Sequence, residues 1–395
     1  MIDGYTEPDW ARVPLRRLAL CRDDLREPVN ATERALMQGD IPYWGANAIQ
    51  DYVNRAKVTS PVVLLGEDGA PFYDREKPVA FYVDEPIWPN NHIHVLLPNI
   101  GTDGRWLAYA LNAVDYSTVI TGSTRDKLTQ GAMMSIPLLT PTLDEQRAIA
   151  DYLDQETTQI DALVAKQKEF IGLLRERRRS VIGQRLSSVV ARRTSLRHLA
   201  RVLSGSGFPV NKQGQVGEEL PFFKVKDLKS AVHGGVLSLA EDSVSRETAK
   251  ALGASIIPSG SLAFAKVGAA LLLGRVGAMP VDGCIDNNMS ALVPKSALEP
   301  SFARYVMLTF DFKRYVLPGP VPSLDMDGLR GFRVPVLAPE GQRAIVTYLD
   351  EQTSRIDTLI AKAEEHISLA KERRAALITA AVTGQFDVRT ARKAG

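Results

Sequence analysis

Few of the reactive side chains in this sequence stand at the spacing that a catalytic or metal site needs. His92 and His94 form the one close histidine pair, but neither a nearby cysteine nor a Glu-x-x-His partner accompanies them, which favours ordinary structural histidines. Cys21 and Cys284 are isolated thiols, for which an inert role is the default. The acids in the run 66–69, Gly-Glu-Asp-Gly, are explained by a tight turn. We therefore expect no catalytic residue and no metal ligand.

Two sequence motifs that would give the chain its own chemistry are missing. No GxxxxGK[ST] run is present, so a Walker-type phosphate-binding loop is not predicted. No Asp/Asn-Pro-Pro-aromatic run is present either, although an adenine amino-methyltransferase would be expected to carry one. Both observations favour a non-catalytic protein.

The distribution of charge favours a nucleic-acid partner for one part of the chain. Residues 187–333 hold 18 Lys and Arg against 12 Asp and Glu, whereas residues 1–135 hold 13 against 18. A basic block is typical of nucleic-acid binders. The acidic first block does not fit a simple version of this interpretation.

Residues that read DNA are expected among basic and amide side chains, because Arg, Lys, Asn and Gln reach base edges and phosphates. Taken singly, each such residue is more often a solvated surface residue. The predicted DNA-binding residues are Lys57, Arg75, Asn91, His92 and Arg125 in the first part of the chain, and Lys224, Lys226, Lys266, Arg275, Asn287 and Asn288 in the second.

Length and composition indicate a globular protein of more than one domain. The chain has 395 residues, of which 45% are hydrophobic and 24% charged, and its glycines and prolines are spread among apolar runs. Only two cysteines are present, which favours a reducing, cytoplasmic location. No apolar stretch reaches the length of about 18 residues that a membrane-spanning helix needs. We expect a soluble protein.

One segment of the sequence occurs twice. The 37 residues that begin at Gln146 align without a gap with those that begin at Gln342, 196 positions later, and 20 of the 37 are identical. Both copies contain Tyr-Leu-Asp, Ile-Asp-x-Leu and Glu-Arg-Arg. Such identity indicates an internal duplication.

Each copy is predicted to form a long helix, because apolar residues recur about every seven positions with charged residues between them. We expect the helices to start near Asp154 and Asp350 and to pack on each other as an antiparallel coiled coil with a pseudo-two-fold relation. The predicted packing residues are Ile160, Leu163, Ile171 and Leu174 in the first helix, and Ile356, Leu359, Ile367 and Leu377 in the second.

The segment before each helix is predicted to be an α+β domain. Short apolar runs that are typical of strands lie at 41–44, 62–65, 79–83 and 94–97, and again at 220–225, 261–264 and 291–293. Residues 105–113 and 301–309 have helical character. The predicted boundaries are 1–135 for the first globular domain, 136–186 for the first helix region, 187–333 for the second globular domain and 334–395 for the second helix region with the tail.

The order of domain, long helix, domain and long helix resembles the specificity subunit of type I restriction-modification enzymes. The resemblance is carried by the duplicated motif, by the ending 379–386 (TAAVTGQF), and by two runs similar to target-recognition domains, 41–46 and 221–228. One departure is Gly341, where the family usually has Glu before the glutamine.

The resemblance implies a chain without chemistry of its own. In the family, each globular domain reads one half of a bipartite DNA target, and the helices form a spacer and dock two methyltransferase subunits. The complex methylates adenine with S-adenosylmethionine, and restriction subunits bound through it cleave DNA with ATP and magnesium. The alternative is a non-catalytic coiled-coil scaffold that joins protein partners, which would not explain why the domains diverge while the helices stay alike.

Overall fold

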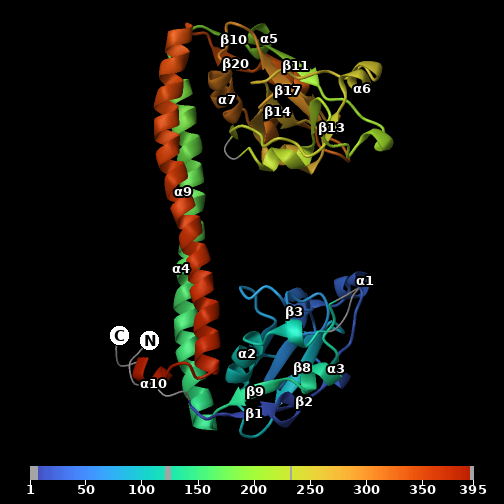
Figure 1. Ribbon diagram of the computed structural model, residues 1–395, viewed down its shortest axis with the longest axis vertical. Coiled ribbons are helices and arrows are strands. Elements are labelled where there is room, and N and C mark those ends of the chain that lie inside the picture. Colours follow the sequence, from blue (N-terminus) through green and yellow to red (C-terminus); the bar gives the residue numbers. More distant parts are fainter. Residues whose placement is uncertain (1–7, 121–125, 232–233, 392–395) are drawn as a thin grey trace. The chain divides into compact units, whose positions relative to one another are not determined.

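The chain forms two compact units in the computed structural model, which describes residues 8–120, 126–231 and 234–391. The first unit contains residues 1–169 and 363–395, and the second contains residues 170–362. Each unit combines one globular α+β domain with part of each of two long helices, α4 (Leu143–Ser187) and α9 (Pro339–Val382) (Figure 1). The α+β class predicted from the sequence is confirmed.

The first globular domain is built on an antiparallel sheet with the strand order β2-β8-β5-β6. Its strands are β2 (Ala19–Cys21), β5 (Val62–Gly66), β6 (Ala80–Val83) and β8 (Ile93–Pro98). Every residue of β5 is buried, as its unbroken apolar run predicts for a central strand. The helix α2 (Gly104–Asn112) packs its buried Trp106 and Leu107 into the same core.

A second, smaller sheet of this domain has the order β4-β3-β7. Strands β3 (Gln38–Trp44) and β4 (Ile49–Val53) form a hairpin, and β7 (Trp88–Pro89) joins β3 in parallel, with Tyr43 opposite Trp88. The parallel pair places the end of β3 beside the turn that leads into β8.

The second globular domain repeats both sheets. One has the order β11-β17-β14-β15, from β11 (Ala200–Ser204), β14 (Leu262–Ala265), β15 (Val276–Ala278) and β17 (Met289–Pro294). The other has the order β13-β12-β16, from β12 (Leu220–Phe223), β13 (Ser243–Val244) and β16 (Cys284–Ile285). Again the pair β12–β16 is parallel, and the helix α7 (Pro300–Leu308) takes the place of α2. The two domains therefore share one fold.

A short two-stranded ladder precedes the long helix in each unit. In the first unit β1 (Ala11–Pro14) pairs with β9 (Pro137–Thr140), and in the second β10 (Arg193–Ser195) pairs with β20 (Arg333–Pro335). The remaining elements are α1 (Ala31–Ala35), α3 (Gln130–Met134), α5 (Leu196–Leu199), α6 (Arg246–Ala251), β18 (Val316–Leu317), β19 (Ser323–Leu324), α8 (Met326–Gly331), α10 (Val388–Ala391) and several 3-10 turns.

Both long helices begin eleven residues before the predicted starts at Asp154 and Asp350, so that prediction was wrong. The first turn of α4 is capped by Thr142, whose hydroxyl accepts from the Glu145 N–H at 3.4 Å, while the Glu145 carboxylate accepts from the Thr142 N–H at 3.0 Å. Pro339 is the first residue of α9, where its missing N–H costs nothing. None of the helices in the described part of the chain is long and apolar enough to cross a membrane.

Within each unit the two helices run antiparallel. In the first unit Leu153 shares a core with Ile378, and further along α4 Asp161 meets Arg374, which lies earlier in α9. In the second unit Leu186 shares a core with Ile345, and Arg178 meets Asp357. In both units, later residues of α4 therefore meet earlier residues of α9, as predicted (Figure 1).

Two of the predicted helix-packing residues are not in the interface. Leu163 is 48% exposed and Leu359 46% exposed, because the inward positions are taken by their neighbours Val164 and Ile360. Among the other predicted packing residues, the structure buries Ile160, Ile171, Leu174 and Ile356 and leaves Ile367 and Leu377 partly buried.

The duplicated polar residues attach each helix to the domain of its own unit. The Gln146 side chain accepts from the Asp103 N–H at 2.8 Å and donates to the Pro141 carbonyl, while Gln342 accepts from the Glu299 N–H at 2.9 Å and donates to the Leu337 carbonyl. Asp154 and Asp350, rather than capping helices, each accept from a tyrosine hydroxyl, Tyr109 and Tyr305. These duplicated residues therefore make equivalent attachments in the two units.

Candidate nucleic-acid interface

The same backbone framework stands at the end of the central strand in both domains. After β5, the Glu67 N–H donates to the His92 carbonyl at 2.9 Å, and after β14, the Lys266 N–H donates to the Asn288 carbonyl at 2.8 Å. The carbonyls of Glu67 and Lys266 in turn accept from Leu128 at 2.7 Å and from Leu324 at 2.9 Å. Glu67 and Lys266 therefore occupy equivalent positions, as do His92 and Asn288.

Beside each of these residues lies a polar turn, which we name the strand-end turn: 90–92 in the first domain and 286–288 in the second. The first residue of each turn donates its N–H to the end of a parallel strand, Asn90 to the Trp44 carbonyl at 3.0 Å and Asp286 to the Phe223 carbonyl at 2.9 Å. Asn91, Asn287 and Asn288 are exposed. Four of the predicted DNA-binding residues therefore lie in these two turns. Asn91 and His92 belong to the turn of the first domain, and Asn287 and Asn288 belong to the equivalent turn of the second.

The second strand-end turn is packed tightly against the strand β11. A Cβ atom added to Gly205 would lie 1.9 Å from the Asp286 carbonyl oxygen, so only glycine allows the approach. The Asn288 N–H donates to the Asp286 carboxylate at 2.7 Å, which closes the turn. The exposed amides of the turn are therefore presented on a fixed backbone.

Two predicted lysines lie next to the second turn. Lys266 follows β14, and its partial burial lowers the pKa of its ammonium group, while the nearby Asp286 acts in the opposite direction. Lys224 follows β12, and its ammonium group pairs with Asp242 at 2.6 Å. The second domain thus offers a cation and several amide groups at one edge, a combination that suits phosphates and base edges.

In the first domain the equivalent edge contains acids, and each is paired within the domain. Glu67 is buried between Arg26 and Lys127, and the latter lies 2.9 Å away. Asp68 lies 2.5 Å from the Nδ1 atom of His92. At this edge the charge of Glu67 is therefore opposed by two cations of the same domain.

Behind this edge, His94 is buried with hydrogen-bond acceptors on both sides of its ring. Its Nδ1 atom lies 2.7 Å from the Asp23 carboxylate and its Nε2 atom 2.9 Å from the Leu128 carbonyl. Burial alone lowers the pKa of His94, but the hydrogen bonds to Asp23, Cys21 and Leu128 outweigh it and raise the pKa to about 9. The ring is therefore a doubly donating cation.

Cys21, Asp23 and His94 come close enough together to be considered as metal ligands, with ligand atoms within 4.8 Å of one another. A metal needs a free lone pair on the imidazole, and both ring nitrogens of His94 already face acceptors. The cluster therefore fits a buried ion pair better than a metal site. In the second domain Ser204 and Ser290 occupy the positions of Asp23 and His94.

The other predicted DNA-binding residues make contacts of their own or lie outside the described residues. Lys57 pairs with Glu27 and lies over the Trp88 ring. Lys226 lies 3.6 Å from Glu241, and Arg275 is exposed just before β15. Arg125 lies outside the described residues. Whether any of the predicted residues contacts DNA stays a prediction.

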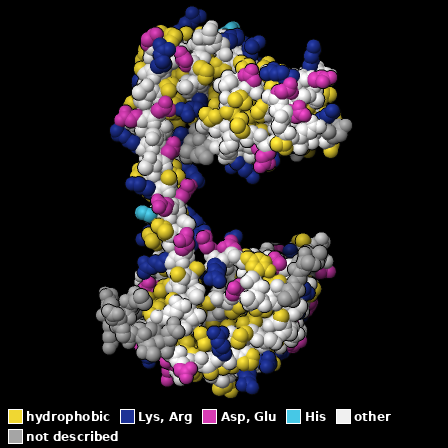
Figure 2. Space-filling view, viewed as in Figure 1, with side chains coloured by type: hydrophobic (Ala, Val, Ile, Leu, Met, Phe, Trp, Pro, Cys, Tyr) yellow, Lys and Arg dark blue, Asp and Glu magenta, His cyan; other side chains and the backbone are white. Residues whose placement is uncertain are grey.

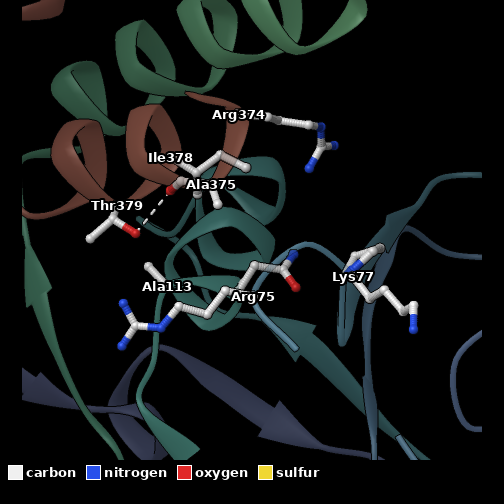
Figure 3. Close-up of a pocket in the computed structure, with 9 residues that line it drawn as sticks. Arg75, Lys77, Ala113, Arg374, Ala375, Ile378 and Thr379 are labelled. Carbon is white, nitrogen blue, oxygen red and sulfur yellow. Dashed lines mark hydrogen bonds between the residues drawn. The ribbon is translucent and has the colours of Figure 1, made fainter. Parts of the chain in front are cut away.

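Arg75 belongs to a different surface. It lines a small pocket with Lys77 and with Arg374, Ile378 and Thr379 of α9, and Figure 3 shows it beside the last turns of that helix. The structure does not bring Arg75 together with Asn91 and His92. On the face in Figure 2, basic and acidic side chains are interspersed over each globular domain rather than separated.

The equivalence of the two turns is also visible in the sequence. The shift of 196 residues that relates Gln146 to Gln342 also relates Asn91 to Asn287 and His92 to Asn288. Extending the aligned segment backwards would have paired these residues. It would not have identified Glu67 and Lys127, because their roles depend on hydrogen bonds between distant parts of the chain.

Comparisons with known proteins point to one family. Residues 27–171 match the family model described as "Type I restriction modification DNA specificity domain". A curated relative, the "Putative type I restriction enzyme specificity subunit" of Haemophilus influenzae, is 32% identical over 157 residues. That match spans 40% of this chain and 39% of the relative's length.

A solved structure shares the fold over nearly the whole chain. A chain of the structure described as "Structural basis underlying complex assembly and conformational transition of the type I R-M system" has a TM-score of 0.70 at 14% identity, covering 97% of this chain and 100% of that one. The HsdS subunit from Thermoanaerobacter tengcongensis has a TM-score of 0.48 at 16% identity, covering 97% and 99%. Residues 27–171 thus belong to the DNA specificity domains of type I restriction-modification systems, and the chain as a whole shares its fold with a chain from a structure of such a system.

Proposed function

We propose that this chain is the specificity subunit of a type I restriction-modification system and reads a bipartite DNA target, with one half-site for each globular domain. The observation that carries the proposal is the pair of strand-end turns, 90–92 and 286–288, which share one backbone framework and differ in side chains. The equivalent backbone hydrogen bonds hold the side chains that would contact DNA at the same place in each domain. Different side chains on them would select different bases.

The chemistry of the two turns supports reading of both bases and phosphates. The amide of Asn pairs with the major-groove edge of adenine, and a lysine contacts phosphate or guanine. The second turn combines Asn287 and Asn288 with Lys266, whereas the first combines Asn91 and His92 with the neutralised Glu67. We therefore expect the second domain to depend more strongly on phosphate contacts.

The long helices are proposed to dock two methyltransferase subunits. Exposed leucines recur at equivalent positions of the repeat, Leu163 with Leu359 and Leu173 with Leu369. The first unit contains Leu163 of α4 and Leu369 of α9. The second unit contains Leu173 of α4 and Leu359 of α9. Apolar residues that stay exposed at both copies suit a partner that binds twice in the same way.

The chain itself is proposed to be non-catalytic. Adenine methylation with S-adenosylmethionine would be performed by the docked subunits. Cleavage with ATP and magnesium would need restriction subunits that join through the complex. This division of labour is what the family resemblance implies and what the missing sequence motifs favour.

A domain exchange tests the proposal. Residues 195–333 would be replaced by the matching segment of a related subunit, the complex with methyltransferase subunits would be assembled, and bound DNA from a random pool would be sequenced. One half-site should change and the other should stay. A change in both halves would contradict independent reading, and a complex without sequence preference would favour the scaffold interpretation.

A further inference from the structure

In the first unit, the end of the chain covers one face of α4. The helix α9 ends at Val382, and Gly384, which has a φ of +71°, turns the chain back. The Gln385 N–H donates to the Ala380 carbonyl at 2.8 Å. The ring of Phe386 then packs edge-on against Tyr152 at 5.7 Å between centroids, and Val388 is buried in the same core. The covered surface includes Ala148 and Ile149.

The second unit contains the same surface without the cover. Ala344, Ile345 and Tyr348 of α9 stand 196 positions after Ala148, Ile149 and Tyr152, with identical side chains. Here Ala344 is exposed and Tyr348 is 44% exposed. Ile345 itself is buried in the core of the second unit. We name Ala344 and Tyr348 with Arg185 the open seat.

The sequence explains why the seat stays open. Ser188 stands at the position of Gly384, so the left-handed turn that reverses the chain after α9 is disfavoured after α4. The chain continues from α4 towards β10 instead. Val190, at the position of Phe386, is fully exposed and covers nothing.

Arg185 gives the open seat a charge that the covered surface lacks. It occupies the position of Ala381, and its guanidinium lies 5.4 Å from the centroid of the Tyr348 ring. Its Nε atom is buried without a hydrogen-bond partner among the described residues. The guanidinium also carries terminal N–H groups, and a carboxylate on a ligand would pair with these by charge-assisted hydrogen bonds.

We propose that the open seat binds a segment of a partner protein with the pattern aromatic, acidic, aliphatic. The model for this occupant is the chain's own Phe386-Asp387-Val388, which fills the matching surface of the first unit. The aromatic ring packs on Tyr348, the aliphatic residue covers Ala344, and the acid pairs with Arg185. The proposal concerns a protein partner and does not depend on DNA reading.

The test uses a synthetic peptide with the sequence of residues 383–391, TGQFDVRTA, titrated into the full chain by calorimetry. We expect one peptide to bind per chain. Tyr348→Ala should weaken binding at least tenfold, and Arg185→Gln should weaken it while removing most of its salt dependence. A peptide in which Asn replaces the acid should bind the unchanged chain as weakly as the original peptide binds Arg185→Gln.

Matched variants of the first unit provide the controls. Tyr152→Ala should leave the site at Tyr348 intact, and Phe386→Ala with Val388→Ala should open a second site and raise the stoichiometry to two. If the unchanged chain binds no peptide while the opened variant binds one, the proposal is wrong. Self-association in sedimentation that Tyr348→Ala abolishes would assign the seat to a second copy of the chain and overturn the assignment to a separate partner.

Discussion

The guanidinium of Arg178 lies 2.9 Å from the carboxylate of Asp357, between the two helices of the second unit. In the first unit Arg374 lies 3.2 Å from Asp161. Arg374 stands at the same position of the repeat as Arg178, 196 residues later, and Asp357 at the same position as Asp161. In one unit the arginine is therefore on α4 and the aspartate on α9, and in the other unit the reverse holds. The two copies of one sequence motif thus pair reciprocally, one contact in each unit.

The two ion pairs should differ in their contribution to stability. The side chain of Arg178 is almost fully buried, whereas that of Arg374 is partly exposed. Asp357→Ala leaves a buried cation without this partner and should cost about 1–3 kcal/mol of unfolding free energy. Asp161→Ala should cost about 0–1 kcal/mol. Urea unfolding with hydrogen exchange of the helix amides measures both, and equal losses would contradict the role of burial.

The sequence predicted the elements well where the apolar pattern was local. The helices expected at 105–113 and 301–309 are α2 and α7, and the strand runs at 62–65 and 291–293 are β5 and β17. The starts of α4 and α9 were missed because Ile149 and Leu153 face the globular domain rather than the partner helix alone, which hides the seven-residue pattern. The true start of α4 has a local signature in the sequence, the capping pair Thr142 and Glu145.

The candidate site was harder to predict. Asn287, Asn288 and Lys266 were identified by residue type, but their neighbourhood depends on strands brought together from distant parts of the chain. The local sequence also does not show which of Leu163 and Val164 faces the partner helix, because adjacent residues on a helix differ by only about 100° in direction. Only packing decides which of them is buried.

The stability of the first unit should fall as pH rises towards 9. The pKa of His94 is raised in the folded state from its ordinary 6.5 to about 9, so its contribution is fully present below about 6.5 and is lost as pH rises through 9. The loss should be on the order of 3 kcal/mol. His94→Gln should flatten this dependence, as measured by thermal unfolding between pH 6 and 10. Amides of the second unit, with Ser290 in the equivalent position, should show no such change, and a parallel loss there would count against the assignment.

The salt dependence of DNA binding should distinguish the lysines of the second domain. Lys266→Ala in the complex with methyltransferase subunits should reduce the slope of log K against log salt by about one unit if the lysine contacts a phosphate. Lys224→Ala should change the slope less, because Asp242 already neutralises the ammonium group of Lys224. Fluorescence anisotropy over a range of salt concentrations measures both slopes. An unchanged slope for Lys266→Ala would place that lysine away from the DNA.

The central claim is that each strand-end turn reads one half of a bipartite target, and sequencing of DNA selected by paired variants tests it most directly. The variants are Asn91→Ala with His92→Ala, and Asn287→Ala with Asn288→Ala, each assembled with methyltransferase subunits. The account predicts that each pair relaxes the preference in one half-site only, and that the two pairs affect opposite halves. Variants that fold and bind but leave both half-sites unchanged, or that relax the same half, would contradict it.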